Sequence, residues 1–70
     1  MKMFLKVADF NRMQSPTNRV IYTDDKGLSF IGPEHEVNLG YTYVVECSTK
    51  LVGEKYYYIM KFIGEGKKLP

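Results

Sequence analysis

Apolar and polar residues alternate along most of this chain in short runs separated by turn-forming residues. The runs are rich in Val, Ile, Tyr, Phe and Thr, and Gly, Pro, Asn and Asp bound them. The first group of residues favours strands and the second favours turns. The pattern predicts five strands, over residues 3–10, 19–23, 28–31, 41–49 and 55–63.

The first run fits two periodicities. As a strand it places Phe4, Lys6 and Phe10 on one face, and as a helix it groups Phe4 with Val7 and Ala8. We expect a strand, because a helix starting here would lack an N-terminal cap. With Lys2, this strand would then present an exposed aromatic and basic face, which burial against another chain would equally explain.

The clearest hairpin lies between the second and third runs, at Asp-Asp-Lys-Gly over residues 24–27. Gly27 supplies the positive φ that closes such a loop, and the two aspartates favour turn conformations. Turn formation also explains the acidic pair without a magnesium ion. Alternation along the second strand places Tyr22 on the inner face and Arg19 on the outer one.

Alternation in the last two strands predicts the remaining core. Cys47 falls in the apolar set of its strand, so we expect a buried and unreactive thiol. The inner set of the last strand is expected to be Tyr56, Tyr58, Met60 and Phe62, with Tyr57 and Lys61 outside.

Five short strands in 70 residues predict an all-β fold. We expect a small five-stranded barrel or a strongly curved antiparallel sheet, since a flat open sheet would leave long unpaired edges. One domain over residues 1–66 and a flexible tail over residues 67–70 account for the whole chain.

Composition excludes several kinds of site. One Cys and one His allow neither an internal disulfide nor a Cys–His zinc site. His35 lies between Glu34 and Glu36, but neighbours on a strand point apart, so we expect no catalytic or metal site and no cofactor. No apolar run approaches a membrane span or a signal peptide, and we expect a non-enzymatic, cytoplasmic protein.

Three stretches resemble OB-fold domains that bind single-stranded nucleic acid. Residues 20–27 (Val-Ile-Tyr-Thr-Asp-Asp-Lys-Gly) resemble the second strand of these domains and the turn that follows it. Residues 39–45 (Leu-Gly-Tyr-Thr-Tyr-Val-Val) resemble the entry to a later strand, and residues 55–59 (Lys-Tyr-Tyr-Tyr-Ile) resemble the aromatic final strands. The resemblance covers residues 19–63 and implies an OB-like barrel, although SH3-like barrels share the pattern. The helix of OB domains has only residues 32–38 available here, enough for about one turn.

Two kinds of binding follow from these observations, and the net charge of +2 favours neither strongly. A single-stranded DNA or RNA would bind a basic and aromatic face of the barrel. The alternative is a protein partner or a second copy of the chain at an exposed edge or apolar patch, as in small regulators of compact viral genomes. The expected nucleic-acid contacts are Arg12, Arg19, Lys26, Lys55, Tyr57 and Lys61, with Lys50 nearby.

Overall fold

The protein folds into five strands, seen here in a computed structural model that describes residues 1–13 and 19–68. All five predicted strands are confirmed, with ends that differ by a few residues. That part of the chain contains no helix, and so none that is long and apolar enough to cross a membrane. The strands are β1 (Lys2–Arg12), β2 (Arg19–Asp24), β3 (Ser29–Pro33), β4 (Thr42–Val52) and β5 (Lys55–Phe62).

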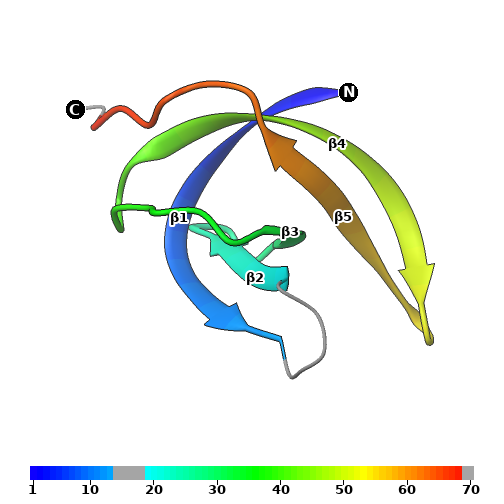
Figure 1. Cartoon of the computed structure of the whole chain (residues 1–70). Helices are drawn as coiled ribbons and strands as arrows, with labels where there is room; N and C mark the ends of the chain where they lie inside the picture. Colours follow the sequence, from blue (N-terminus) through cyan, green and yellow to red (C-terminus); the bar gives the residue numbers. More distant parts are fainter. Residues whose placement is uncertain (14–18, 69–70) are drawn as a thin grey trace.

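The strands form a closed barrel in the order β1-β2-β3-β5-β4 (Figure 1). Strand β1 closes it, because residues 2–6 pair with β4 and residues 7–12 pair with β2. All neighbouring strands are antiparallel except β3 and β5, which run parallel where Phe30 and Ile31 lie beside Tyr58 and Ile59. The predicted barrel is confirmed, but its sheet is mixed rather than purely antiparallel.

A β-bulge interrupts β1 where its pairing passes from β4 to β2. The register with β2 shifts between Val7 and Asp9. Beyond the shift, Phe10 lies opposite Tyr22, which is fully buried, so Phe10 lies on the inner side of the sheet. The expectation that Phe10 shares an outer face with Phe4 was therefore wrong, because the extra residue of a bulge reverses the alternation.

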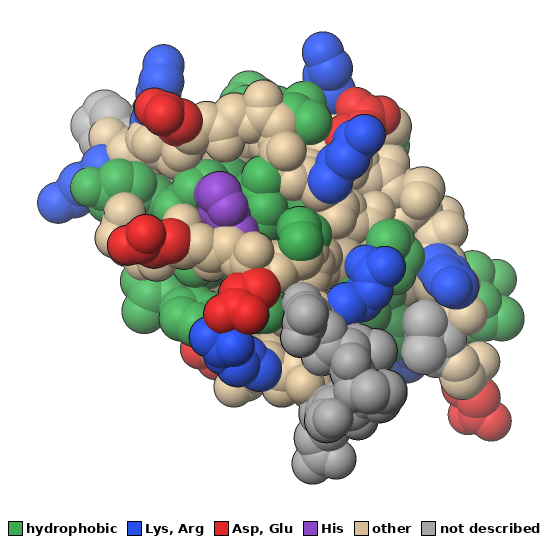
Figure 2. Space-filling view, viewed as in Figure 1, with side chains coloured by type: hydrophobic (Ala, Val, Ile, Leu, Met, Phe, Trp, Pro, Cys, Tyr) green, Lys and Arg blue, Asp and Glu red, His purple; other side chains and the backbone are tan. Residues whose placement is uncertain are grey.

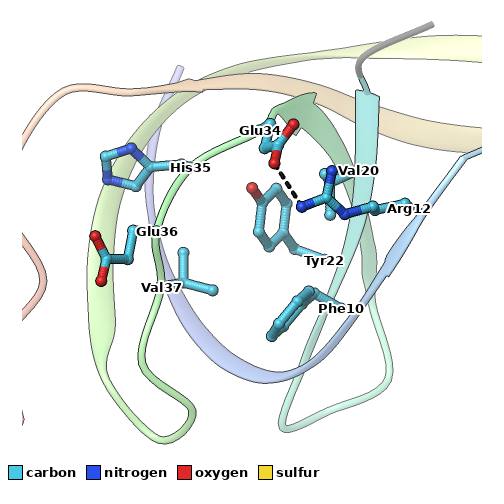
Figure 3. A pocket seen from close by; sticks show the side chains of 8 residues that line it. All are labelled: Phe10, Arg12, Val20, Tyr22, Glu34, His35, Glu36 and Val37. Atoms are coloured by element: carbon cyan, nitrogen blue, oxygen red, sulfur yellow. Dashed lines mark ion pairs between the residues drawn. The ribbon is translucent and has the colours of Figure 1, made fainter.

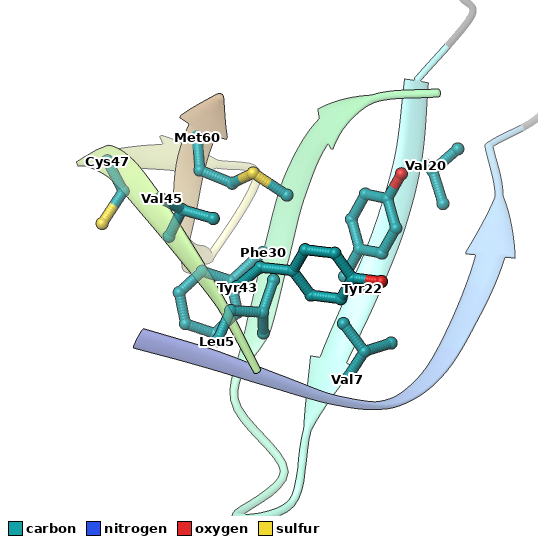
Figure 4. Close-up of a cluster of buried hydrophobic side chains, with 9 residues drawn as sticks. All are labelled: Leu5, Val7, Val20, Tyr22, Phe30, Tyr43, Val45, Cys47 and Met60. Carbon is teal, nitrogen blue, oxygen red and sulfur yellow. The ribbon is translucent and has the colours of Figure 1, made fainter. Parts of the chain in front are cut away.

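The barrel interior is filled by side chains from all five strands (Figure 4). Tyr22 and Phe30 are the largest of those that are fully buried, as expected for Tyr22 from its strand position. Cys47 is 4% exposed, which confirms the predicted buried thiol. The cluster consists of Leu5, Val7, Val20, Tyr22, Phe30, Tyr43, Val45, Cys47 and Met60.

The tyrosines of β5 divide differently from the prediction. Tyr58 packs against the core and its ring stacks on Phe30 at 5.0 Å between centroids, but Tyr56 is 74% exposed. Tyr56 pairs with Leu51 near the end of the β4–β5 hairpin, which projects past the other strands (Figure 1). This part of the hairpin extends beyond the barrel core, so an inward-facing side chain here is not buried. The assignment of Tyr56 to the interior was therefore wrong.

The segment between β3 and β4 covers one end of the barrel without forming the helix that the OB resemblance implies. Val37 packs against the core. The backbone N–H of Asn38 donates to the Tyr43 hydroxyl at 2.8 Å, and the N–H of Gly40 donates to the Val7 carbonyl at 2.8 Å. These contacts attach the segment to both β1 and β4.

The C-terminal segment crosses β4 and pairs with it. Lys67 exchanges two backbone hydrogen bonds with Thr42, at 2.8 and 3.0 Å. A Cβ atom on Gly66 would overlap the Tyr43 ring, so only glycine fits against that ring. The ordered pairing therefore extends one residue into the predicted tail, while residues 69–70 lie outside the described part.

The β2–β3 hairpin forms as predicted around Asp24. The buried Asp24 carboxylate accepts hydrogen bonds from the backbone N–H groups of Lys26 at 2.9 Å and Leu28 at 2.8 Å. Gly27 has a φ of 86°, the left-handed conformation that glycine adopts without strain. The Asp24 carboxylate thus stabilises the turn.

Replacing Asp24 should destabilise the barrel far more than replacing its neighbour. Asp24→Ala removes the charged acceptor of two part-buried backbone hydrogen bonds and should lower the free energy of unfolding by about 2 kcal/mol. Asp25→Ala, at an exposed position of the same turn, should change it by less than about 0.5 kcal/mol. Urea denaturation measures both, and equal midpoints for the two variants would contradict the role given to Asp24.

Candidate functional site

One continuous outer surface spans β2, β3 and β5, which are neighbours in the barrel. Successive side chains of a strand point to opposite faces, so the buried Val20, Tyr22, Phe30 and Met60 identify the outward positions. We refer to these outward residues as the outer face. They are Arg19, Ile21 and Thr23 on β2, Ser29, Ile31 and Pro33 on β3, and Lys55, Tyr57, Ile59 and Lys61 on β5.

An apolar row crosses the middle of the outer face. Ile21 lies opposite Ile31, and Ile31 lies beside Ile59, so one isoleucine comes from each strand. Ile31 is 4% exposed although it lies outside the core cluster, which means that its neighbours on the outer face cover it. Ile21 and Ile59 are half-buried. The row gives this surface an apolar strip three strands wide.

Basic and aromatic residues flank the isoleucine row. Arg19, Lys55 and Lys61 are exposed, and Tyr57 is half-buried. Tyr57 lies opposite the exposed Lys50 of β4, which extends the basic surface by one strand. The structure thus places four of the six predicted contacts, Arg19, Lys55, Tyr57 and Lys61, on one surface.

The other two predicted contacts lie elsewhere. Lys26 is exposed in the β2–β3 turn, at the opposite end of β2 from Arg19. Arg12 lies opposite Val20 on the inner side of the sheet, because the bulge in β1 reverses its direction as it does for Phe10. Arg12 also forms an exposed ion pair with Glu34. It does not belong to the outer face.

Arg12 and Phe10 instead line a pocket of about 340 Å³ at one end of the barrel (Figure 3). No sequence pattern predicts this pocket, because it depends on the bulge in β1 and on the path of the segment after β3. The side chains that line it are Phe10, Arg12, Val20, Tyr22, Glu34, His35, Glu36 and Val37.

The floor of the pocket is aromatic and aliphatic, and its polar groups lie at the rim. The rings of Phe10 and Tyr22 are 6.4 Å apart between centroids, and Phe10 is 43% exposed. The Tyr22 hydroxyl donates a hydrogen bond of 2.7 Å to the Pro33 carbonyl, so its donor is already used. The Arg12–Glu34 ion pair lies above these rings (Figure 3).

His35, which lines the pocket, also belongs to an aromatic cluster with Phe62 and Tyr43. Its ring stacks on Phe62 at 4.3 Å between centroids and meets Tyr43 edge-on at 6.2 Å. Figure 2 shows hydrophobic side chains exposed around this one histidine of the chain. Among the described residues, no group of three or more His, Cys, Asp or Glu side chains is arranged to hold a metal. The packing contacts give His35 a structural role, and the absence of enzymatic activity stays a prediction.

A second exposed apolar surface lies on the other side of the barrel, on β1 and β4. Phe4 is 75% exposed and lies opposite Val44, with Lys2 and Lys6 at the adjacent outward positions of β1. This part of the predicted aromatic and basic face is present without Phe10. Phe4 and Val44 line a hollow of about 350 Å³ together with Thr42, Glu65 and Lys67.

The N-terminal ammonium group engages the acid that lies beside Lys61. Glu46 is opposite Lys61 in the β4–β5 pairing, and its carboxylate accepts a hydrogen bond of 2.7 Å from the Met1 ammonium group. This hydrogen bond lowers the pKa of Glu46. Burial raises the pKa of the Cys47 thiol on the neighbouring position, which keeps it protonated and unreactive.

The buried Tyr22 should make stability depend on pH in the alkaline range. Burial raises the pKa of its phenol above the usual value of 10.0, so the unfolded chain ionises first and the contribution of Tyr22 declines as the pH rises beyond about 10. Tyr22→Phe should be less stable by about 1 kcal/mol at neutral pH, through loss of the bond to Pro33. Urea denaturation of both proteins should show this difference shrinking above pH 10, and a constant difference would contradict it.

Comparison of the chain with protein-family models, with curated proteins and with solved structures finds no match. The chemistry of the two surfaces and of the pocket follows from their own residues. The outer face combines positive charge with apolar area, and the pocket combines aromatic walls with a charged rim. The second apolar surface, formed by Phe4 and Val44 on β1 and β4 and called the Phe4 surface below, lies beside Lys2 and Lys6.

Proposed function

We propose that the protein binds single-stranded nucleic acid across the outer face of β2, β3 and β5. The observation that carries this proposal is the charge of that face. Its outward positions on these three fully described strands include Arg19, Lys55 and Lys61 and no acidic residue. A phosphate backbone is attracted to such a surface although the net charge of the whole chain is only +2.

The separation of charges supports the proposal. Asp24 is the buried, inward-facing last residue of β2, and the other acids lie in turns, in the segments after β3 and β5, and on β1 and β4. These other acids are Asp9, Asp25, Glu34, Glu36, Glu46, Glu54 and Glu65. Three acids neighbour basic residues of the outer face: Glu46 lies opposite Lys61, Glu54 precedes Lys55, and Glu34 follows Pro33, which pairs with Arg19. The Met1 ammonium group engages Glu46, and Arg12 engages Glu34. The modest net charge thus arises mainly from acids placed outside the binding surface.

The apolar part of the outer face supplies what bases need. Single strands bind through base stacking on aromatic side chains and through backbone contacts with basic residues. Tyr57 is the half-buried ring of the face, and Ile59 follows it at the next outward position of β5. Lys50, opposite Tyr57, places a positive charge beside the ring.

The barrel itself is consistent with this use. We propose that it is an OB-type barrel, the architecture that the sequence resembles, since five strands close into a mixed barrel in the order β1-β2-β3-β5-β4. OB barrels bind oligonucleotides on the face of their second and third strands, which is where the isoleucine row begins. The irregular segment over residues 34–41, in place of a helix, is a departure from that family.

The Phe4 surface supports the alternative function, binding of a protein partner or a second copy of the chain. Phe4 is 75% exposed and lies opposite the half-buried Val44, with which it lines one hollow. Adjoining apolar side chains of this kind give a partner chain an apolar surface to cover. This surface lies on β1 and β4, whereas the outer face lies on β2, β3 and β5. The two functions therefore predict that ligand binding depends on residues of different strands.

Substitutions on the outer face should weaken nucleic-acid binding, and a matched substitution on β1 should leave it unchanged. Fluorescence anisotropy of a labelled oligothymidine measures the affinity of each variant. Tyr57→Ala should weaken binding by a factor of roughly 5 to 150, the range for loss of one stacked ring, whereas Phe4→Ala should have little effect. If Arg19, Lys55 and Lys61 each contact a phosphate, affinity should fall roughly twentyfold between about 50 and 200 mM salt, and only about sevenfold in Lys61→Gln.

Two outcomes would contradict the proposal. Absence of binding at low salt would exclude a nucleic-acid interface. Binding that Phe4→Ala weakens as much as Tyr57→Ala would move the site to β1 and β4.

A further inference from the structure

The pocket at the end of the barrel has the size and lining of a ligand site. Its volume of about 340 Å³ lies at the lower end of the range of roughly 300–1,000 Å³ for small-molecule sites. The bulge in β1 turns Phe10 towards Tyr22, and Val20 and Val37 complete an apolar lining (Figure 3). Phe10 nevertheless stays 43% exposed, so one aromatic ring remains open to a ligand. A small planar ring fits this combination.

The rim of the pocket carries both hydrogen-bond donors and acceptors. Arg12 supplies guanidinium donors and Glu34 supplies carboxylate acceptors, and their side chains are 71% and 50% exposed. An ion pair this exposed contributes about 0–1 kcal/mol, so a ligand can separate it at little cost. The Tyr22 hydroxyl is already bonded to Pro33, and Arg12 and Glu34 are the polar groups that lie above the rings of Phe10 and Tyr22 (Figure 3). His35 and Glu36 also line the pocket, on the side of Val37, and the His35 ring is stacked on Phe62.

Guanine matches this rim better than the other bases. A carboxylate can accept two parallel N–H bonds, and guanine presents two adjacent N–H donors, at N1 and N2, on one edge. The O6 acceptor beside N1 then faces the guanidinium group, because Arg12 is already next to Glu34. Adenine, cytosine and thymine each lack the pair of adjacent donors.

The pocket lies at the end of β2 that carries Arg19. Arg19 belongs to the outer face, and the next residue, Val20, points to the inner side of the sheet and lines the pocket. On the neighbouring strand Pro33 pairs with Arg19 and precedes Glu34 at the rim. A strand of nucleic acid that contacts Arg19 would reach the pocket by passing around this end of β2 and β3.

We infer that this pocket accepts one guanine base of a bound single strand. The ring stacks on Phe10, Glu34 accepts the N1 and N2 protons, and Arg12 donates to O6. The inference rests on the proposed nucleic-acid binding and deepens it, because it adds a base preference to a surface that otherwise contacts phosphates and stacks bases without discrimination.

The test compares a labelled oligothymidine with the same oligonucleotide carrying one central guanine or one central adenine. One guanine should raise the affinity about tenfold, the lower part of the range for a bidentate base contact, and one adenine should not. Glu34→Gln should reduce the guanine increment to less than about twofold, because an amide replaces one acceptor by a donor. Glu65→Gln, an exposed acid on the Phe4 side of the barrel, should retain the full increment.

A second measurement keeps the inference separate from the proposed function. Guanosine monophosphate should shift the methyl NMR signals of Val20 and Val37, and adenosine monophosphate should not. Binding of oligothymidine without a guanine increment, or with an increment that survives in Glu34→Gln, would overturn the inference and leave the proposed function intact. If no oligonucleotide binds, shifts caused by guanosine monophosphate alone would support the pocket without the outer face, and their absence would overturn both.

Discussion

The double pairing of β1 is the constraint on which the rest of the structure depends. One strand pairs with β4 over its first half and with β2 over its second half, and this closes the barrel. The bulge between Val7 and Asp9 falls where the pairing changes, and it bends the strand and reverses its alternation. Leu5 and Val7 therefore enter the core before the bulge, and Phe10 and Arg12 point towards the barrel end after it. Closure encloses a core to which every strand contributes.

The same geometry separates the surfaces by chemistry. The outer face of β2, β3 and β5 is basic and apolar, the bulge directs Arg12 away from it, and Arg12 instead meets Glu34 at the pocket. Most acids are placed where they serve another contact or lie off that face, as with Asp24 in its turn and Glu46 under the Met1 ammonium group. A chain with a net charge of only +2 thereby presents one surface suited to a polyanion, beside a pocket suited to a base.

The strands and much of the core could be predicted from the sequence because their signals are local. Alternation placed Tyr22, Cys47 and Met60 inside, and the Asp-Asp-Lys-Gly turn between β2 and β3 was recognisable from its residue types. The predictions were wrong at positions whose orientation or burial is set by contacts between distant parts of the chain. The bulge reversed Phe10 and Arg12, and the length of the β4–β5 hairpin carried Tyr56 beyond the core. The parallel pairing of β3 with β5 and the covering of the barrel end by residues around Val37 are likewise set by tertiary contacts.

The central claim is that the surface of β2, β3 and β5 receives the nucleic acid, and backbone NMR tests it most directly. In a titration of the ¹⁵N-labelled protein with oligothymidine, the account predicts amide shifts concentrated on β2, on β3 and on residues 57–61 of β5. The amides around Phe4 and Val44, on β1 and β4, should change little. Shifts centred on Phe4, or no shifts at low salt, would contradict the account.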